Sequence, residues 1–203
     1  MTFFIYTNIY VNHVLNNLRD SLQPYLEKIG KGFASTGLSP NFWTGVGITF
    51  AFASAIAYGL DIEFALIIGG ILLLISGFFD IVDGQVARVT NKTSKQGAFL
   101  DSVFDKIAEV VIFLGILIGG YADPYLILLA ITLSLLVSYT RARAESLGIK
   151  LQGIGIGERA ERLIVIAIIG MIGFMEYAVI IVIIIAAITL IQRILSTAKQ
   201  LNN

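Results

Sequence analysis

Long apolar runs separated by short polar breaks dominate the chain after residue 40. A bilayer hydrocarbon core about 30 Å thick needs about 20 apolar residues for each helical span. Runs of that length, bounded by polar or helix-breaking residues, predict six spans over residues 41–60, 63–83, 98–121, 124–141, 160–175 and 177–196. The pattern therefore predicts an all-α integral membrane protein, with six transmembrane helices in one domain over residues 38–203.

The N-terminal segment, residues 1–37, has a different pattern. Between residues 10 and 36, groups of apolar side chains are interleaved with polar and charged ones. This pattern is typical of an amphipathic helix that lies on a membrane surface, and Pro24 predicts a bend or break within it. We therefore expect a juxtamembrane amphipathic helix on the cytoplasmic surface, ahead of the transmembrane domain.

Composition supports a membrane protein and excludes several other classes. Of the 203 residues, 57% are hydrophobic and 14% charged, and the mean hydropathy is +0.86, which is too apolar for a water-soluble domain. A formal net charge of zero and a pI of about 6.6 argue against a nucleic-acid partner, which would need a basic face. The absence of cysteine excludes disulfides and thiol chemistry.

Basic residues predict the orientation in the membrane. All 14 Lys and Arg residues lie before the first predicted span, in or beside the turns after the second and fourth spans, or near the end of the chain. The opposite turns carry only acidic charge, from Asp61, Glu63, Asp123 and Glu176. By the positive-inside rule, both termini and both basic loops are cytoplasmic. The prediction is a multi-pass cell-membrane protein whose active site faces the cytosol.

Four aspartates stand at the facing ends of the second and third predicted spans. Asp80 and Asp83 are three residues apart, and Asp101 and Asp105 are four apart, so each pair shares one helix face. The short loop between the spans allows the two pairs to converge. Uncompensated carboxylates at a membrane boundary repel one another and lose hydration, so a converging set implies bound cations or a function.

Bound metal is the prediction for this cluster. Asp80 and Asp83 lie near a predicted helix C-terminus, where the macrodipole already disfavours negative charge. Arg88 and Lys106 are the only cationic side chains that we expect near the cluster, too few for four aspartates. Oxygen ligands in this number favour Mg²⁺, Mn²⁺ or Ca²⁺, and two ions about 4 Å apart are usual for phosphoryl chemistry. The alternative is a set of solvated loop residues that cap helices or pair with Arg88.

The spacing of these residues resembles the signature of the CDP-alcohol phosphotransferases, Asp-Gly-x2-Ala-Arg-x8-Gly-x3-Asp-x3-Asp. The chain meets it at Asp83, Gly84, Ala87, Arg88, Gly97, Asp101 and Asp105, and Asp80 adds the upstream aspartate that these enzymes often show. The six-span layout and the preceding surface helix are also similar to that family. The resemblance implies transfer of a substituted phosphate from a CDP-alcohol to a hydroxyl acceptor, with release of CMP.

The resemblance also implies roles for individual residues. The four aspartates would hold two Mg²⁺ ions, with Mn²⁺ as the alternative, and Asp105 matches the position of the family's general base. The CDP site would be lined by Asp80, Gly84, Ala87, Arg88, Asn41 and Thr44.

Four of these CDP-site residues also have a simpler structural interpretation. Gly84 can be a helix C-cap, and Arg88 can be a side chain that reaches out of the membrane. Asn41 and Thr44 can belong to a helix N-terminus that Ser39 and Pro40 begin.

Arginines around the second predicted cytoplasmic loop bear on the acceptor. Arg141, Arg143, Arg159 and Arg162 offer a basic pocket to an anionic substrate, although a positive-inside flank with local Arg–Glu pairs is the alternative. These segments resemble the family branch that makes phosphatidylinositol phosphate or archaetidylinositol phosphate. In that branch the acceptor is inositol 1-phosphate, and residues matching Arg141, Arg159 and Arg193 would bind its phosphate.

Other functions remain open at this point. Glycerol 3-phosphate is the competing acceptor, because it is also a phosphate-bearing alcohol. An ion-coupled transporter is the alternative from another class, since acidic residues in spans also mark transport pathways. A transporter predicts carboxylates near the bilayer midplane and an internal repeat, whereas these carboxylates gather at one face. The family resemblance further implies a CDP-linked lipid donor, a surrounding bilayer and a homodimer.

Overall fold

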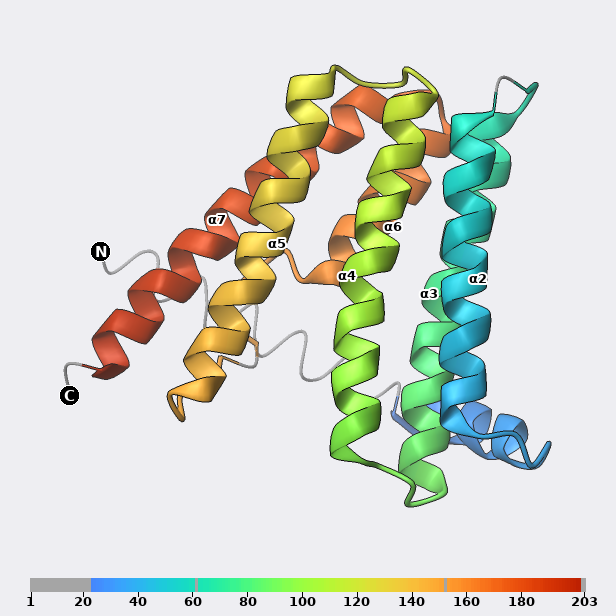
Figure 1. Ribbon diagram of the computed structural model, residues 1–203, viewed down its shortest axis with the longest axis vertical. Helices are drawn as coiled ribbons and strands as arrows, with labels where there is room; N and C mark the ends of the chain where they lie inside the picture. The colour runs from blue at the N-terminus through green and yellow to red at the C-terminus, as the bar shows by residue number, and fades with distance from the viewer. Residues whose placement is uncertain (1–22, 61, 152, 202–203) are drawn as a thin grey trace.

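The computed structural model describes residues 23–60, 62–151 and 153–201, and these residues form helices and no strand. The labelled helices are α2 (Pro40–Gly59), α3 (Ala65–Val89), α4 (Lys95–Ile118), α5 (Pro124–Ser146), α6 (Arg159–Met171) and α7 (Met175–Leu201). They run up and down through the molecule, with α6 behind α4 in the view of Figure 1. The all-α prediction is confirmed.

Polar capping residues set the start of three helices. The Ser39 side chain accepts a hydrogen bond from the Phe42 amide at 3.3 Å at the start of α2, where Pro40 occupies the first turn. Ser94 caps α4 and Asp123 caps α5 in the same way. These side chains satisfy amide groups that a helix N-terminus otherwise leaves without partners.

Within the described part of the chain, four helices are long and apolar enough to cross a membrane, namely α2, α3, α5 and α7. Helix α4 carries several charged residues, and α6 has only 13 residues, which at 1.5 Å each give about 20 Å of helix. Gly173 adopts a φ of +88° between α6 and α7, so the chain turns earlier than the sequence pattern predicted. Four candidate spans are therefore observed where six were predicted.

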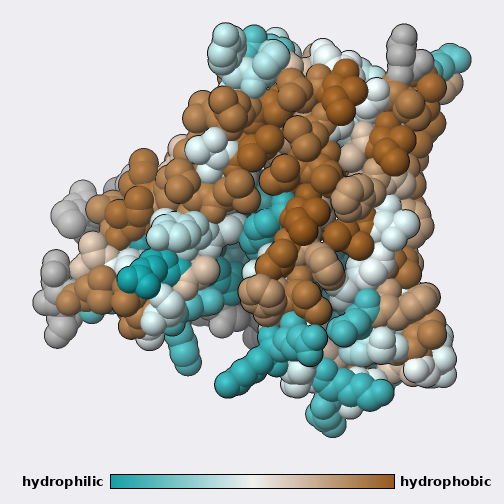
Figure 2. Space-filling model, in the orientation of Figure 1, coloured by the Kyte–Doolittle hydropathy of each residue, from teal (hydrophilic) through white to brown (hydrophobic). Residues whose placement is uncertain are grey.

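The outer surface is strongly apolar, as a membrane protein requires. Large hydrophobic side chains such as Leu128, Ile164 and Ile184 are exposed to the surroundings. Figure 2 shows hydrophobic residues covering the upper and middle part of one face, with hydrophilic residues gathered towards the lower end. The polar chemistry of the chain is thus confined mainly to one end of an apolar helical body.

The segment ahead of α2 is helical over residues 23–34. Ile29 and Phe33 pack against a buried cluster of Trp43, Val82 and Val86, while Glu27, Lys28 and Lys31 are exposed. The amphipathic pattern thus serves, at least for this stretch, to dock the helix on α2 and α3. The predicted helix before Pro24 lies outside the described residues.

Close helix packing depends on glycine at the crossing of α2 and α4. Gly115 lies where a Cβ atom would overlap the backbone carbonyl and Cα of Ala55. Small residues at such crossings allow two membrane helices to approach closely. Gly77 in α3 differs, because a Cβ atom there would meet no other heavy atom within 4 Å.

We expect Gly115→Ala to lower the stability of the protein by about 1–3 kcal/mol, because α2 and α4 must move apart to admit the methyl group. Thermal melting of the detergent-purified protein measures this effect. Gly77→Ala is the matched control and should melt at the wild-type temperature or above. Equal melting temperatures for the two variants would contradict this packing account.

A candidate metal centre between two clefts

Helices α3 and α4 bring three of the four predicted aspartates together. Carboxylate oxygens of Asp80, Asp101 and Asp105 lie within 4.8 Å of one another. Asp80 comes from α3, and the other two come from successive turns of α4, across the short loop that joins these helices. The expected convergence of the two helix faces is therefore seen in the geometry of these three side chains.

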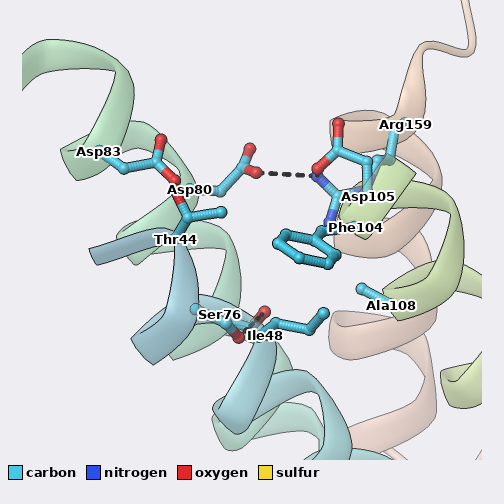
Figure 3. Close-up of a pocket in the computed structure, with 10 residues that line it drawn as sticks. Thr44, Ile48, Ser76, Asp80, Asp83, Phe104, Asp105, Ala108 and Arg159 are labelled. Carbon is cyan, nitrogen blue, oxygen red and sulfur yellow. Dashed lines mark hydrogen bonds and ion pairs between the residues drawn. The ribbon is translucent and has the colours of Figure 1, made fainter. Parts of the chain in front are cut away.

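Asp83 lies apart from that group, on the side of Thr44 in Figure 3. Its side chain is buried, with 6% of the residue exposed, and one carboxylate oxygen has no hydrogen-bond partner among the described residues. Buried polar atoms almost always have a partner, so this oxygen calls for a cation or a ligand donor. Helix α3 continues beyond Asp83 to Val89, so the expected position at a helix C-terminus is wrong.

Arg159 supplies a positive charge that local sequence did not reveal. Its Nη1 atom lies 3.0 Å from Asp80 Oδ1 and also forms an ion pair with Asp105. Figure 3 shows the guanidinium between these two carboxylates. The expectation that Arg88 and Lys106 are the only nearby cations is therefore wrong, because α6 delivers Arg159 from far along the chain.

The donor set suits a hard divalent cation. Three mutually close carboxylates and a fourth with a buried, unpaired oxygen offer only oxygen ligands. Arg159, with Lys106 at 3.8 Å from Asp105, balances part of this negative charge. Carboxylate oxygens in such number are the ligands that Mg²⁺, Mn²⁺ and Ca²⁺ prefer. The residues present therefore fit a divalent metal.

The residues predicted for CDP binding gather around a cleft of about 210 Å³. Its walls come from α2, α3, the start of α4 and the loop before α4, and they include Asn41, Thr44, Asp83, Gly84, Ala87, Arg88 and Asp101. Asp80 does not line this cleft and faces the neighbouring ones instead.

Gly84 is not a helix C-cap, because α3 runs past it, and a Cβ atom there would meet nothing within 4 Å. The helix N-cap interpretation holds for Ser39 and Pro40, whereas Asn41 and Thr44 line the cleft.

A second cleft, of about 480 Å³, contains all three arginines predicted for the acceptor. Arg141, Arg159 and Arg193 line it, opposite Asp101 and Asp105. Figure 2 shows a hollow with hydrophilic side chains between the lower parts of α4 and α5. Arg143 is not among the lining residues and instead donates to Ser146 Oγ.

Hydrogen bonds and ion pairs hold two of the cleft arginines in place. Arg193 is 2% exposed, and its Nη1 and Nε atoms donate to the carbonyls of Val137 and Ile154 at 2.7 and 3.0 Å. Glu158 accepts from Arg193 at 3.3 Å and lies 3.9 Å from Arg141, which also pairs with Glu145. The expected local Arg–Glu pairing thus describes the half-exposed Arg141, but the long-range contacts of Arg193 were not predicted.

The two clefts meet at the aspartates predicted to bind metal. Ala98 and Asp101 line both of them, and Asp80 and Asp105 face the larger one. A group bound in the first cleft can therefore approach a group bound in the second at this carboxylate cluster. The arrangement suits transfer between two substrates, one of which carries phosphates.

Known proteins with similar sequences support this interpretation. The family described as CDP-alcohol phosphatidyltransferase matches residues 38–192. Archaetidylinositol phosphate synthase of Pyrococcus horikoshii is 37% identical over 188 residues, which are 93% of this chain and 98% of that protein. The synthase of the same name from Methanothermobacter thermautotrophicus is 40% identical over 153 residues, 75% of each chain.

Similar solved structures include phosphatidylinositol phosphate synthase of Mycobacterium tuberculosis with CDP-DAG bound. That crystal structure has a TM-score of 0.73 and 26% sequence identity, covering 85% of this chain and 92% of the other. A second structure of that enzyme, in complex with manganese and citrate, has the same TM-score of 0.73. The predicted family and the prediction of a phosphotransferase enzyme are confirmed by the family match and the named relatives. This chain is a membrane enzyme and belongs to the CDP-alcohol phosphatidyltransferase family.

Proposed function

We propose that this enzyme transfers the phosphatidyl or archaetidyl group of a CDP-activated lipid to inositol 1-phosphate and releases CMP. One observation carries the proposal: the aspartate cluster lies where the cleft of the predicted CDP residues meets the cleft of the three arginines. The names of the relatives from Pyrococcus and Methanothermobacter support inositol phosphate as the acceptor and archaetidyl lipid as the donor.

The donor would bind with its nucleotide in the smaller cleft. Asp80, Asp83, Asp101 and Asp105 would hold two Mg²⁺ ions, or Mn²⁺ as in the related crystal structure, which neutralise phosphate charge and stabilise the leaving CMP. Arg88 would clamp a phosphate through its planar fork of donors. Gly84 leaves open space beside the cleft, which lets the pyrophosphate approach the helix backbone.

The acceptor would bind in the larger cleft, with its phosphate on Arg141, Arg159 and Arg193. Asp105 lies on the wall of this cleft and would take the proton from the attacking hydroxyl. The hydroxyl oxygen then attacks the β-phosphorus of the donor. The bond from that phosphorus to the bridging oxygen breaks, and CMP leaves with that oxygen. Glycerol 3-phosphate is the alternative acceptor, because its phosphate would fit the same arginines.

We further propose that α4 and α6 complete a six-helix transmembrane domain with a cytoplasmic active site. The charged residues of α4 lie in its first half, and the residues from Val110 to Ile118 are apolar. Arg141, Arg143 and Lys199 lie in the last turns of α5 and α7, consistent with the positive-inside rule. A homodimer remains a prediction from the family resemblance.

A panel of candidate acceptors, compared by the CMP that each one releases, tests the proposal directly. Purified protein with a CDP-lipid and Mg²⁺ should release CMP when inositol 1-phosphate is added, and should release much less with glycerol 3-phosphate or serine. CDP-archaeol and CDP-diacylglycerol, compared as donors, identify the lipid. Release of CMP with glycerol 3-phosphate but not with inositol 1-phosphate would contradict the assignment of inositol 1-phosphate as the acceptor.

Replacement of the proposed base should separate binding from chemistry. We expect Asp105→Asn to lower turnover by about 10²–10⁴-fold, because the amide cannot accept the hydroxyl proton. Binding of CDP, measured by calorimetry, should remain detectable in this variant. Asp123→Asn is the control, since an Asn side chain can still cap α5 through its oxygen. Full turnover by Asp105→Asn would remove the base assignment.

Loss of a cleft arginine should weaken the acceptor selectively. We expect Arg141→Gln to raise the KM for inositol 1-phosphate by about 10–100-fold, because one charge-assisted contact to the phosphate is lost. The KM for the CDP-lipid should stay within about twofold of wild type, since Arg141 does not line the donor cleft. Arg143→Gln is the matched control, because Arg143 lies two residues after Arg141 on α5 and does not line the cleft. Equal kinetic effects of the two variants would contradict acceptor binding by Arg141.

A further inference from the structure

A second ion pair between α4 and α6 lies deeper in the protein than the contact of Arg159 with Asp105. Arg162 donates from Nε and Nη2 to the two carboxylate oxygens of Glu109, at 2.8 and 2.9 Å. Both residues are 1% exposed. Glu109 belongs to no site described above, and Arg162 was predicted only as one of four arginines of a basic pocket.

Every nitrogen group of the Arg162 guanidinium is already engaged. Its third nitrogen, Nη1, donates to the carbonyl of Gly157 at 2.7 Å. The amide of Gly157 in turn donates to Thr189 Oγ1 of α7 at 2.9 Å. Arg162 thus uses three of its five N–H groups on Glu109 and Gly157, although it also borders the larger cleft. Its contacts join α4, the chain before α6, and through Gly157 also α7.

The pair stands in register with the active-site contacts. Glu109 follows Asp105 by four residues on α4, and Arg162 follows Arg159 by three residues on α6. Residues with these spacings share one face of a helix. The two ion pairs are thus stacked along the junction of α4 and α6.

The segment between Gly157 and Arg159 also reaches the other cleft arginines. Glu158 lies between these two residues in the chain and contacts both Arg193 and Arg141.

A buried ion pair is poor evidence of a purely stabilising role. Desolvation of both charges offsets much of their attraction, and apolar replacements of similar size are often equally stable. A bidentate Arg–carboxylate pair, by contrast, allows essentially one relative geometry. Helix α4 packs chiefly on α2, and α6 packs chiefly on α3 and α7. Long side chains are therefore well suited to set the spacing of α4 and α6.

We infer that Glu109 and Arg162 are positioning residues for the acceptor cleft: their buried pair holds the 157–159 segment against α4, so that Arg159 meets Asp105 while Glu158 meets Arg141 and Arg193. This inference rests on the proposed function and names residues that act through others. It makes a selective prediction, because the donor cleft is built from α2, α3, α4 and the α3–α4 loop, without α6. Loss of the pair should therefore affect the acceptor and spare the donor.

The decisive variant replaces both partners, Glu109→Leu with Arg162→Met, which leaves no unpaired buried charge. We expect it to fold, with a melting temperature near that of wild type. Its KM for inositol 1-phosphate should rise about tenfold or more and its kcat should fall, as small misplacements of catalytic groups cost up to about 100-fold. The KM for the CDP-lipid should remain within about twofold. Arg162→Lys, which keeps the charge but not the fork, should lie in between.

Two controls separate positioning from general damage and from the choice of acceptor. Ile127→Val removes a buried carbon from the core near the start of α5, weakens the fold with the pair intact, and should leave the acceptor KM unchanged. Calorimetric binding of inositol 1-phosphate, and of inorganic phosphate, tests the cleft without turnover. If wild type uses glycerol 3-phosphate instead, the same kinetic comparison is made with that acceptor. Failure of the acceptor panel is therefore distinct from failure of this inference.

Three outcomes overturn the inference. The double variant could bind and use the acceptor as well as wild type does. It could lose donor and acceptor affinity equally. It could also fail to fold, in which case the pair serves the stability of the protein and not the geometry of the cleft.

Discussion

Negative charge gathered at one end of an apolar helical body is the constraint on which the site depends. Carboxylates that leave water without cationic partners are costly, and the cost grows when several lie close together. Three aspartates lie within 4.8 Å of one another, and the fourth is buried with an unpaired oxygen. Arg159 neutralises part of this negative charge, and the remaining carboxylate oxygens are suited to bind a divalent metal. The clefts for both substrates are arranged around this balance of charge.

The short segment before α6 links the parts of the acceptor cleft. Gly157 contacts α7 through Thr189, Glu158 contacts Arg193, and Arg159 reaches the aspartates of α3 and α4. Each contact is directional and joins elements that are distant in sequence. A small displacement of this segment would move several acceptor contacts at once, which makes its attachment to α4 important.

Apolar packing and polar chemistry are separated along the molecule. The main hydrophobic core includes Tyr58, Phe113, Ile127 and Ile166, which are fully buried. The charged clefts lie beyond this core, towards one end of the helices, as Figure 2 shows for one face. Tight crossings such as that at Gly115 keep the helices rigid. In the proposed function, this rigid apolar body would allow the polar end to hold a donor that carries both a lipid and a charged head.

The sequence by itself determined the helical class, the start of α2 at Ser39 and Pro40 and the paired aspartates, because these depend on spacings of three or four residues within one helix. It also contained the family signature, which indicated transfer of a substituted phosphate from a CDP-alcohol. Only the tertiary structure brought Arg159 within hydrogen-bond distance of Asp80, from which it is 79 residues distant in the chain. It also placed Asp83 apart from the other aspartates, and it joined Arg162 to Glu109. Such contacts depend on how whole helices pack, and local periodicity does not encode that packing.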